Sequence, residues 1–214
     1  MTGLTALIDY ESGNLHSAQK AFERMARETD AGEVVVTSDP ALVARADRIV
    51  LPGDGAFPAC RRALFEHSGI FEAMDEAVNR RGVPFFGICI GMQMLADTGR
   101  EYEDTPGFGW IGGEVVEIAP EDPALKVPHM GWNDLVIDHA HPVLAGIETG
   151  DHAYFVHSYH FRVANPQERL AHVDYAGEVT AVVGKGNVFG TQFHPEKSQA
   201  AGLRIIANFL GWQP

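Results

Sequence analysis

The chain is poor in cysteine and in basic residues. Two of its 214 residues are cysteines, Cys60 and Cys89, which are too few for a disulfide framework. They lie 29 positions apart, so no close pair predicts a structural zinc site. Lysine and arginine number 16 against 29 acidic residues, for a formal net charge of −13. We therefore expect a reduced, cytoplasmic protein that binds neither nucleic acid nor an anionic membrane surface.

Long hydrophobic runs are also absent. The most apolar stretch, residues 83–95, is shorter than the ~20 residues that cross a bilayer, and it contains Gln93. The first residues lack the basic start and long apolar core of a secretory signal. Because 45% of the residues are hydrophobic and 21% are charged, the composition is that of an ordinary soluble globular protein.

The first half of the chain alternates between apolar strand patterns and helix patterns. Such alternation in short units predicts a parallel α/β sheet with right-handed crossovers. The predicted strands are residues 4–8, 34–36, 48–51 and 83–88, and the predicted helices are 15–25, 56–64, 70–80 and 92–97.

The second half is rich in short β patterns separated by turns, which indicates antiparallel strands. These patterns cover residues 113–118, 135–137, 153–163, 171–175 and 179–183, and a final helix is predicted over 200–210. We therefore predict an α/β fold in one domain over residues 1–214. It has a mixed, mostly parallel central sheet flanked by helices, with an antiparallel β extension.

The segment around Cys89 is the most informative part of the sequence. A buried strand leads into Gly87-Ile88-Cys89-Ile90-Gly91, and a helix pattern follows. This is the cysteine form of the nucleophile elbow, in which two glycines let the strand and the helix approach closely around a strained central residue. The turn places the thiol at the carboxyl edge of the sheet, near amide donors that favour a thiolate. Cys60 has no such frame, and we interpret it as a small buried core residue.

A nucleophilic thiol needs a base, and His194-Pro195-Glu196 supplies a candidate. His194 can take the thiol proton and later give it to a leaving amine. Glu196 can orient the imidazole and stabilise its charged form.

Acyl transfer also needs hydrogen-bond donors for the developing oxyanion. The string Leu51-Pro52-Gly53-Asp54-Gly55 follows a predicted strand, and we expect backbone donors at Gly53 and at Ile90. The same string also suits an ordinary tight turn, and both interpretations can hold together.

Together, these residues resemble the class I (triad) glutamine amidotransferases. The matching strings cover residues 51–55, 87–93 and 193–196. Further strings at 8–15, 128–133, 154–159 and 194–198 resemble one member of that family, a glutaminase subunit that serves histidine biosynthesis. The resemblance thus runs through nearly the whole chain.

The resemblance implies an activity and a site. Cys89 attacks the side-chain amide of L-glutamine and gives a glutamyl thioester and ammonia, with His194 and Glu196 completing the triad. Three residues are implied to hold the α-amino and α-carboxylate groups of glutamine: Gln93 and the backbone around Ser158 and Tyr159. No cofactor and no metal are implied. Asp54 departs from the family's pattern within the oxyanion turn, and we expect its side chain to point away from the site.

The resemblance also implies a partner, a (β/α)8-barrel cyclase subunit that forms a heterodimer with this chain and receives its ammonia. The sequence agrees with this, because it has no phosphate-binding Walker loop and no fused synthase domain for the acceptor chemistry. The residues expected at the interface, or in coupling the two sites, are Asn14, Met130, Trp132, Tyr154 and Lys197.

Several alternatives remain open from the residues alone. The triad also fits glutaminases of pyridoxal phosphate, anthranilate or guanylate synthesis, although the strings at 128–133 and 154–159 argue against them. A cysteine peptidase or thiol hydrolase on a related sheet is a second class, and a non-catalytic binding module is a third. The pairs His139/His141 and His157/His160 have no convincing third metal ligand.

Overall fold

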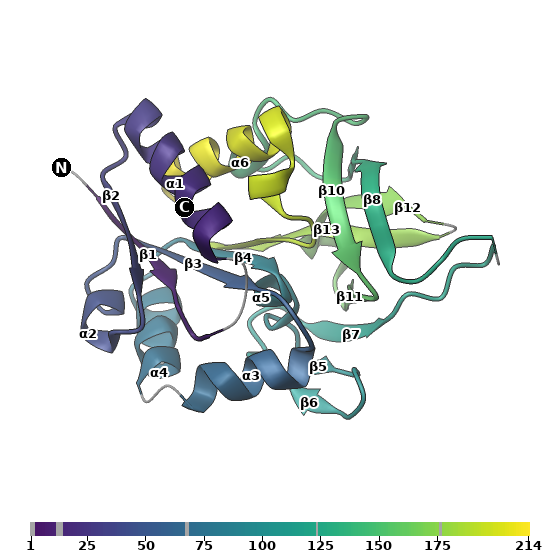
Figure 1. Ribbon diagram of the computed structural model, residues 1–214, viewed down its shortest axis with the longest axis horizontal. Helices are drawn as coiled ribbons and strands as arrows, with labels where there is room; N and C mark the ends of the chain where they lie inside the picture. The colour runs from purple at the N-terminus through teal and green to yellow at the C-terminus, as the bar shows by residue number, and fades with distance from the viewer. Residues whose placement is uncertain (1–2, 12–14, 67–68, 123, 176) are drawn as a thin grey trace.

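An eight-stranded sheet crosses the molecule in the order β2-β1-β3-β4-β14-β13-β12-β9 (Figure 1). The first five strands are parallel and the last three join antiparallel, as expected for a mixed sheet. The computed structural model describes residues 3–11, 15–66, 69–122, 124–175 and 177–214. The strands are β1 (Leu4–Ile8), β2 (Glu33–Thr37), β3 (Arg48–Gly53), β4 (Phe85–Cys89), β9 (Val136–Ile137), β12 (Arg169–Asp174), β13 (Glu178–Lys185) and β14 (Val188–Thr191).

Helices cover both faces of the parallel part of this sheet (Figure 1). Helices α1 (Leu15–Thr29) and α6 (Gln199–Gly211) lie on one face, and α2 (Pro40–Val43), α3 (Phe57–Glu66) and α4 (Ile70–Asp75) lie on the other. Because α1 buries residues at helical spacing, its apolar stripe faces the sheet. Phe22 of α1, Phe86 of β4 and Phe209 of α6 contact one another, with ring centroids 5.1–6.4 Å apart. This aromatic cluster fixes both helices against the strand that carries Cys89.

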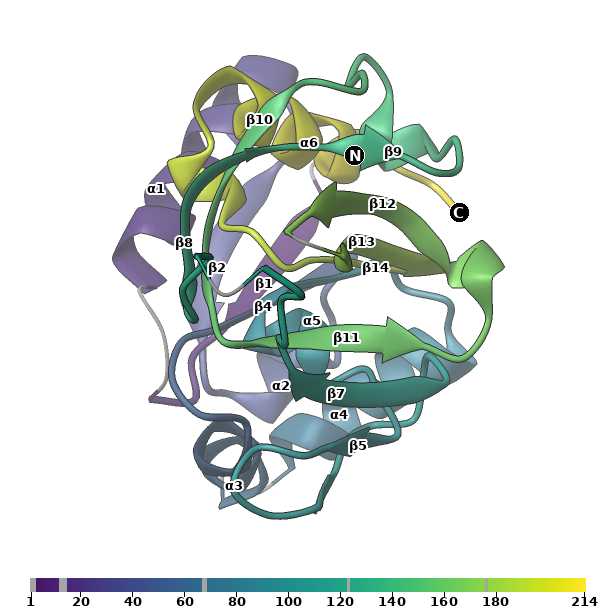
Figure 2. The ribbon, with the colours of Figure 1, turned by 90° about the vertical axis from the view of Figure 1, so that its right-hand side faces the viewer.

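Two smaller sheets extend the molecule beyond the central one (Figure 2). One pairs β8 (His129–Asp134) with β10 (His152–His157), and the other has the order β11-β7-β5-β6. Its strands are β5 (Thr98–Gly99), β6 (Thr105–Pro106), β7 (Gly113–Glu117) and β11 (Tyr159–Val163). The predicted β segment over 153–163 is therefore two strands in different sheets, because the chain leaves one ladder at Ser158.

Some element boundaries differ from the sequence-based expectations. The helix predicted over 92–97 is a short α5 (Ile90–Gln93), which starts at the elbow itself. The helix predicted over 70–80 changes after α4 into the π-helical η1 (Glu76–Arg80). Strand β8 was not predicted, because it is rich in polar residues. The turn at residues 184–187 is typical of a hairpin, and β14 follows it and pairs antiparallel with β13. Three 3₁₀ turns complete the described elements: η2 (Pro142–Leu144), η3 (Pro166–Glu168) and η4 (Pro195–Lys197). Within the described residues, no helix is long and apolar enough to cross a membrane.

The elbow after β4 has the strained geometry that its sequence predicts. Cys89 lies at φ 55° and ψ −109°, a conformation that costs a non-glycine residue about 1–3 kcal/mol. A Cβ at Gly87 would lie 2.5 Å from the carbonyl oxygen of Gly91, and one at Gly91 would lie 1.9 Å from that of Leu51. Both contacts are with backbone, so no side chain can move aside, and the two glycines are required.

Replacing Gly91 therefore provides a test of this packing. We expect Gly91→Ala to lower the free energy of unfolding by about 3 kcal/mol or more, because the new methyl group overlaps the β3 backbone. Gly211→Ala is the matched control, since a Cβ there meets nothing within 4 Å. Urea unfolding of both variants measures the difference, and a loss below about 1 kcal/mol for Gly91→Ala would contradict the packing described here.

Candidate active site

Cys89 and His194 come together because β4 and β14 are neighbours in the sheet. The two strands are parallel, with Gly87 opposite Gly190 and Ile88 opposite Thr191. Cys89 ends β4, and the segment that follows β14 runs through Gln192 to His194 at the same carboxyl edge of the sheet. Gln192 donates a hydrogen bond from Nε2 to Sγ of Cys89 at 3.6 Å. The thiol and the imidazole, which are remote in sequence, thus follow the carboxyl ends of neighbouring strands.

His194 and Glu196 form a buried pair. Nδ1 of His194 lies 2.9 Å from Oε1 of Glu196, and their side chains are 5% and 3% exposed. Nε2 of His194 is buried and makes no hydrogen bond of standard geometry within the described residues, so it is available to the thiol. Burial lowers the pKa of His194, but hydrogen bonding and charge from Cys89 and Glu196 outweigh that effect and raise it to about 10. These partners therefore favour the imidazolium.

The backbone of His194 is held by strand β10. Its amide donates to the carbonyl oxygen of Tyr154, and its own carbonyl oxygen accepts from Oγ of Ser198 at 2.7 Å. Ser198 Oγ in turn accepts a hydrogen bond from the amide of Tyr154. Tyr154, expected at an interface, thus also positions the candidate base through its main chain.

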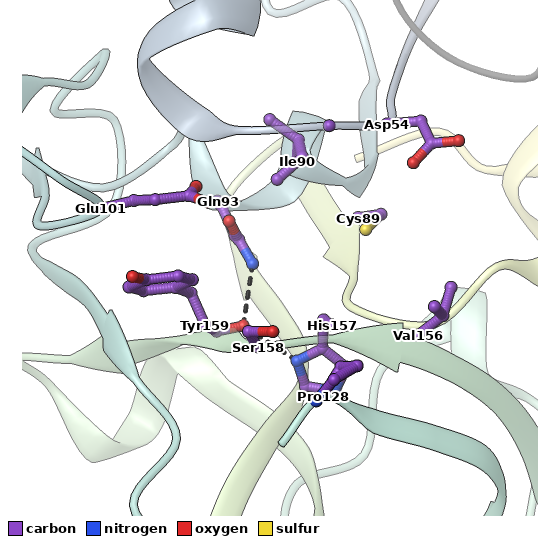
Figure 3. A pocket seen from close by; sticks show the side chains of 11 residues that line it. Asp54, Cys89, Ile90, Gln93, Glu101, Pro128, Val156, His157, Ser158 and Tyr159 are labelled. Carbon is purple, nitrogen blue, oxygen red and sulfur yellow. Dashed lines mark hydrogen bonds between the residues drawn. The ribbon is translucent and has the colours of Figure 1, made fainter.

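A cavity of about 250 Å³ opens beside the sulfur (Figure 3). Its lining brings together the three residues expected to bind glutamine, Gln93, Ser158 and Tyr159. Gln93 is fully buried, and its Nε2 donates to the carbonyl oxygen of Tyr159 and to Oε1 of Gln192. Both amide hydrogens of Gln93 are thus used, and its Oε1 is left without a partner among the described residues. The remaining lining residues are Asp54, Gly55, Cys89, Ile90, Glu101, Pro128, Val156 and His157.

The expected oxyanion donors lie against the elbow. Gly53, the last residue of β3, is in register with Cys89. A Cβ on Gly53 would come within 3.0 Å of Ile90 Cβ, of the Tyr10 hydroxyl and of the Gly91 amide nitrogen, so the turn packs directly on the elbow. Tyr10 fixes the turn further, because its hydroxyl donates to the carbonyl oxygen of Pro52 at 2.7 Å.

Asp54 is the residue that departs from the family's pattern in the oxyanion turn. It is exposed and contributes to the rim of the cavity (Figure 3). Because water reaches the carboxylate there, solvent and salt screen its charge from an oxyanion.

Two further residues of the site were not predicted. Glu101 is 8% exposed, lines the cavity, and accepts a 2.7 Å hydrogen bond from the amide of Phe57 at the start of α3. Gln192 is fully buried beside the sulfur. Glu101 lies in an acidic loop with no distinguishing pattern, and only the folded chain brings it to the pocket. Gln192 could have been found from its place two residues before His194.

The residues expected at an interface differ in their exposure. Met130 and Trp132 are 63% and 48% exposed on β8. The Tyr154 ring packs edge-on against Trp132, with centroids 5.8 Å apart. Lys197 is half-buried in η4, next to the candidate triad. Asn14 lies outside the described residues.

No metal-binding group is evident in the part of the chain that the structure describes, where no three His, Cys, Asp or Glu side chains gather around a common point. Two of the histidines considered as ligands have other partners. Nδ1 of His141 accepts from the Val143 amide, and His157 bonds to Tyr159.

Comparisons with known proteins agree with this fold. The family described as "Glutamine amidotransferase class-I" matches residues 6–211, and the chain belongs to that family. A solved structure titled "Crystal structure of glutamine amidotransferase" superposes with a TM-score of 0.73 at 20% identity, covering 97% of this chain and 99% of that one. A glutamine amidotransferase from Thermotoga maritima gives a TM-score of 0.66 at 16% identity, over 92% of this chain and 77% of that one. The predicted fold class is thereby confirmed.

The sequence relatives are more specific. The proteins named "Imidazole glycerol phosphate synthase subunit HisH" from Cereibacter sphaeroides and Ruegeria pomeroyi are each 72% identical to this chain over 211 residues. Each match covers 99% of this chain and 100% of the relative. The protein of the same name from Rhodospirillum rubrum is 62% identical, and the match covers 98% of this chain and 99% of that protein. Within the class, the chain therefore belongs with the HisH subunits of imidazole glycerol phosphate synthase.

The raised pKa of His194 predicts a pH dependence of stability. The folded state keeps a proton on His194 that the unfolded chain releases near the usual pKa of 6.5. The resulting stabilisation is complete below pH 6.5 and is lost as the pH rises to about 10. We expect Glu196→Gln to lower the pKa of His194, to destabilise the fold by about 2 kcal/mol at pH 6, and to flatten this pH dependence.

Urea unfolding between pH 6 and pH 10 measures how the free energy of unfolding depends on pH. Glu76→Gln is the matched control, because Glu76 pairs with Arg80 in an exposed bridge that contributes little. If the free energy of unfolding changes equally with pH in Glu196→Gln and in the unmodified chain, the His194–Glu196 pair does not hold the proton on His194.

Proposed function

We propose that this chain hydrolyses L-glutamine to glutamate and ammonia, as the glutaminase subunit of an imidazole glycerol phosphate synthase in histidine biosynthesis. The observation that carries the proposal is the placement of Cys89 on a strained elbow, beside the buried His194–Glu196 pair, at the edge of a cavity. One catalytic domain over residues 1–214 and a cytoplasmic location belong to the same proposal.

The reaction follows from the geometry in two half-reactions. Sγ of Cys89 attacks the side-chain amide carbon of glutamine, and the thiol proton passes to Nε2 of His194. The raised pKa of His194 favours the state in which Nε2 already holds this proton. As the C–N bond breaks, His194 gives that proton to the leaving nitrogen, and ammonia and a thioester form. Water then attacks the thioester carbon, His194 takes its proton, and the returning proton regenerates the thiol as glutamate leaves.

Backbone amides stabilise the tetrahedral intermediates in this proposal. The Ile90 amide follows the nucleophile and lies at the start of α5, and the Gly53 turn packs on it from the neighbouring strand. Removing one such donor typically reduces kcat by about 10²–10³.

The cavity offers complementary groups for the two ends of free glutamine. The buried carboxylate of Glu101 suits the α-ammonium group, and it remains oriented by the Phe57 amide. The backbone at Ser158 and Tyr159 and the free Oε1 of Gln93 provide polar contacts on the other wall. A buried negative charge facing the substrate amine favours a free amino acid over an internal residue of a peptide, which argues against a cysteine peptidase.

The ammonia requires a partner. In water at neutral pH it would be mostly ammonium, which is no nucleophile, so it must be delivered without release to bulk solvent. We propose a (β/α)8-barrel cyclase subunit that forms a heterodimer with this chain. The exposed Met130 and Trp132 on β8, with Tyr154 and Lys197 nearby, suit such an interface, because large exposed apolar side chains on a strand are typical anchors.

Cys89→Ala tests the proposal. Without the sulfur no thioester forms, so we expect glutamine-dependent product formation by the assembled enzyme to fall by at least about 10³-fold. Added ammonium salt should still support the cyclase reaction, because the partner's site is intact. Cys60→Ser is the matched control, because serine retains a donor to the carbonyl oxygen of Asp54, and its glutamine-dependent rate should remain near that of the unmodified enzyme.

Persistent glutamine use by the Cys89→Ala variant would remove Cys89 as the nucleophile. Hydrolysis of peptides but not of glutamine by the unmodified chain would favour a thiol hydrolase. Glutamine hydrolysis that does not depend on an added cyclase and its nucleotide ligand would contradict the coupling to a partner.

A further inference from the structure

Three polar side chains, two buried histidines and the half-buried Asn133, connect strand β8 to the candidate glutamine pocket. His157, at the end of β10, lines the cavity, and its Nε2 lies 3.2 Å from Nδ1 of His129 on β8. Nε2 of His129 lies 3.3 Å from Nδ2 of Asn133 on the same strand. The two histidines are only 3% and 6% exposed. None of the three takes part in the chemistry proposed for Cys89.

The partners at each end determine the direction of this chain of hydrogen bonds. The carbonyl oxygen of Tyr159 can only accept, so Nδ1 of His157, 2.8 Å away, carries a proton. Burial lowers the pKa of His157 to about 3 and that of His129 to about 4, so both rings are neutral at pH 7. Nε2 of His157 is therefore an acceptor, and His129 donates to it from Nδ1. Nε2 of His129 in turn accepts from Asn133.

Asn133 is itself held in the orientation that this direction requires. Its Oδ1 accepts a 2.8 Å hydrogen bond from the Asp134 amide, which identifies the other atom as the nitrogen. Nδ2 also donates to the carbonyl oxygen of Asp174 at 3.1 Å. All hydrogen-bonding atoms of the Asn133 side chain are therefore used, and the chain of donors cannot reverse without breaking one of these bonds.

The other end of this hydrogen-bond chain is the Tyr159 carbonyl, in the lining of the glutamine pocket. The carbonyl oxygen of Tyr159 accepts both from His157 and from Nε2 of Gln93, at 2.8 Å and 3.0 Å (Figure 3). Two donors occupy both lone pairs of this oxygen and fix the plane of the peptide after it. The preceding carbonyl, that of Ser158, is fixed by the Ile118 amide at 2.8 Å. The turn that we assign to glutamine binding is thus oriented from both sides.

Strand β8 presents the opposite face to solvent. His129 is buried, whereas Met130 and Trp132, which project to the other side of the strand, are among the most exposed large apolar side chains described. In its two-stranded sheet, β8 pairs with β10 alone, with His129 opposite His157 and Trp132 opposite Tyr154. A displacement of β8 relative to β10 therefore changes the His129–His157 contact.

We infer that Asn133, His129 and His157 are positioning residues. They form a directional hydrogen-bond chain that holds the Tyr159 carbonyl, and with it the glutamine subsite, in a fixed position relative to strand β8. The inference rests on the proposed function, since it assigns these residues to the glutamine subsite. This hydrogen-bond chain makes the affinity for glutamine sensitive to the position of β8, and it does not affect the chemical step at Cys89.

The tautomers provide a test that is independent of activity. Long-range ¹H–¹⁵N spectra of the full chain at pH 7 should show both rings with a proton on Nδ1 and none on Nε2. A proton on Nε2 of either ring, or an imidazolium, would overturn the proposed direction. This result stands whether or not the chain hydrolyses glutamine.

Substitutions at His129 test the positioning role. Leu at this position keeps apolar packing on Phe155 and Tyr175. It removes the donor to Nε2 of His157 and one of the two acceptors of Asn133. We expect His129→Leu to raise the KM for glutamine about tenfold with kcat within about twofold, measured as glutamate release with the cyclase present. His129→Asn retains a donor near the Nδ1 position and should recover KM to within about threefold of the unmodified enzyme.

His141→Leu is the matched control. His141 is another histidine whose pKa burial lowers to about 4, and it stacks on Phe189 outside the pocket. It should change the melting temperature without changing KM. Equal KM values for His129→Leu and His141→Leu would contradict the positioning role and leave His129 as a packing residue. A KM for His129→Asn as high as that for His129→Leu would contradict it as well. If the unmodified enzyme releases no glutamate, the proposed function fails instead, and the spectra still decide the hydrogen-bond direction.

Discussion

The parallel pairing of β4 with β14 is the constraint on which the rest of the site depends. Cys89 and His194 are more than 100 positions apart, yet each follows the carboxyl end of one of these adjacent strands. The register places the thiol and the imidazole at one edge of the sheet, and the Phe22–Phe86–Phe209 cluster secures β4 from one face. The chemistry therefore depends on sheet topology and on core packing rather than on a local motif.

The strained backbone at Cys89 depends on the close packing around it. A positive φ turns the side chain out of the β4 ladder, and it persists because Gly87 and Gly91 let three backbone segments meet at the elbow. The same closeness brings the Gly53 turn onto Ile90. The proposed nucleophile and the proposed oxyanion donors are thus positioned by the same contacts, so a change at either glycine affects both.

The features that follow from local pattern were predictable, and those that follow from tertiary packing were not. The elbow at Cys89, the His194–Glu196 pair and the alternation of strands and helices are visible as spacing and residue type in the sequence. Glu101 is a buried acid only because α3 places the Phe57 amide against it, and its surrounding sequence looks like a surface loop. Likewise β8 lacks an apolar run, since its inward-facing positions hold His129, Gly131 and Asn133, and His129 and Asn133 bond to one another.

The central claim is that Cys89 alone is the activated thiol in a site that accepts glutamine, and selective alkylation tests it most directly. The full chain, assembled with the proposed cyclase subunit, is treated with an electrophilic ketone analogue of glutamine, and peptides are mapped by mass spectrometry. We predict one equivalent of label on Cys89, blocked by excess glutamine, and none on the buried Cys60. Label on Cys60, or labelling of Cys89 that glutamine does not slow, would contradict the account.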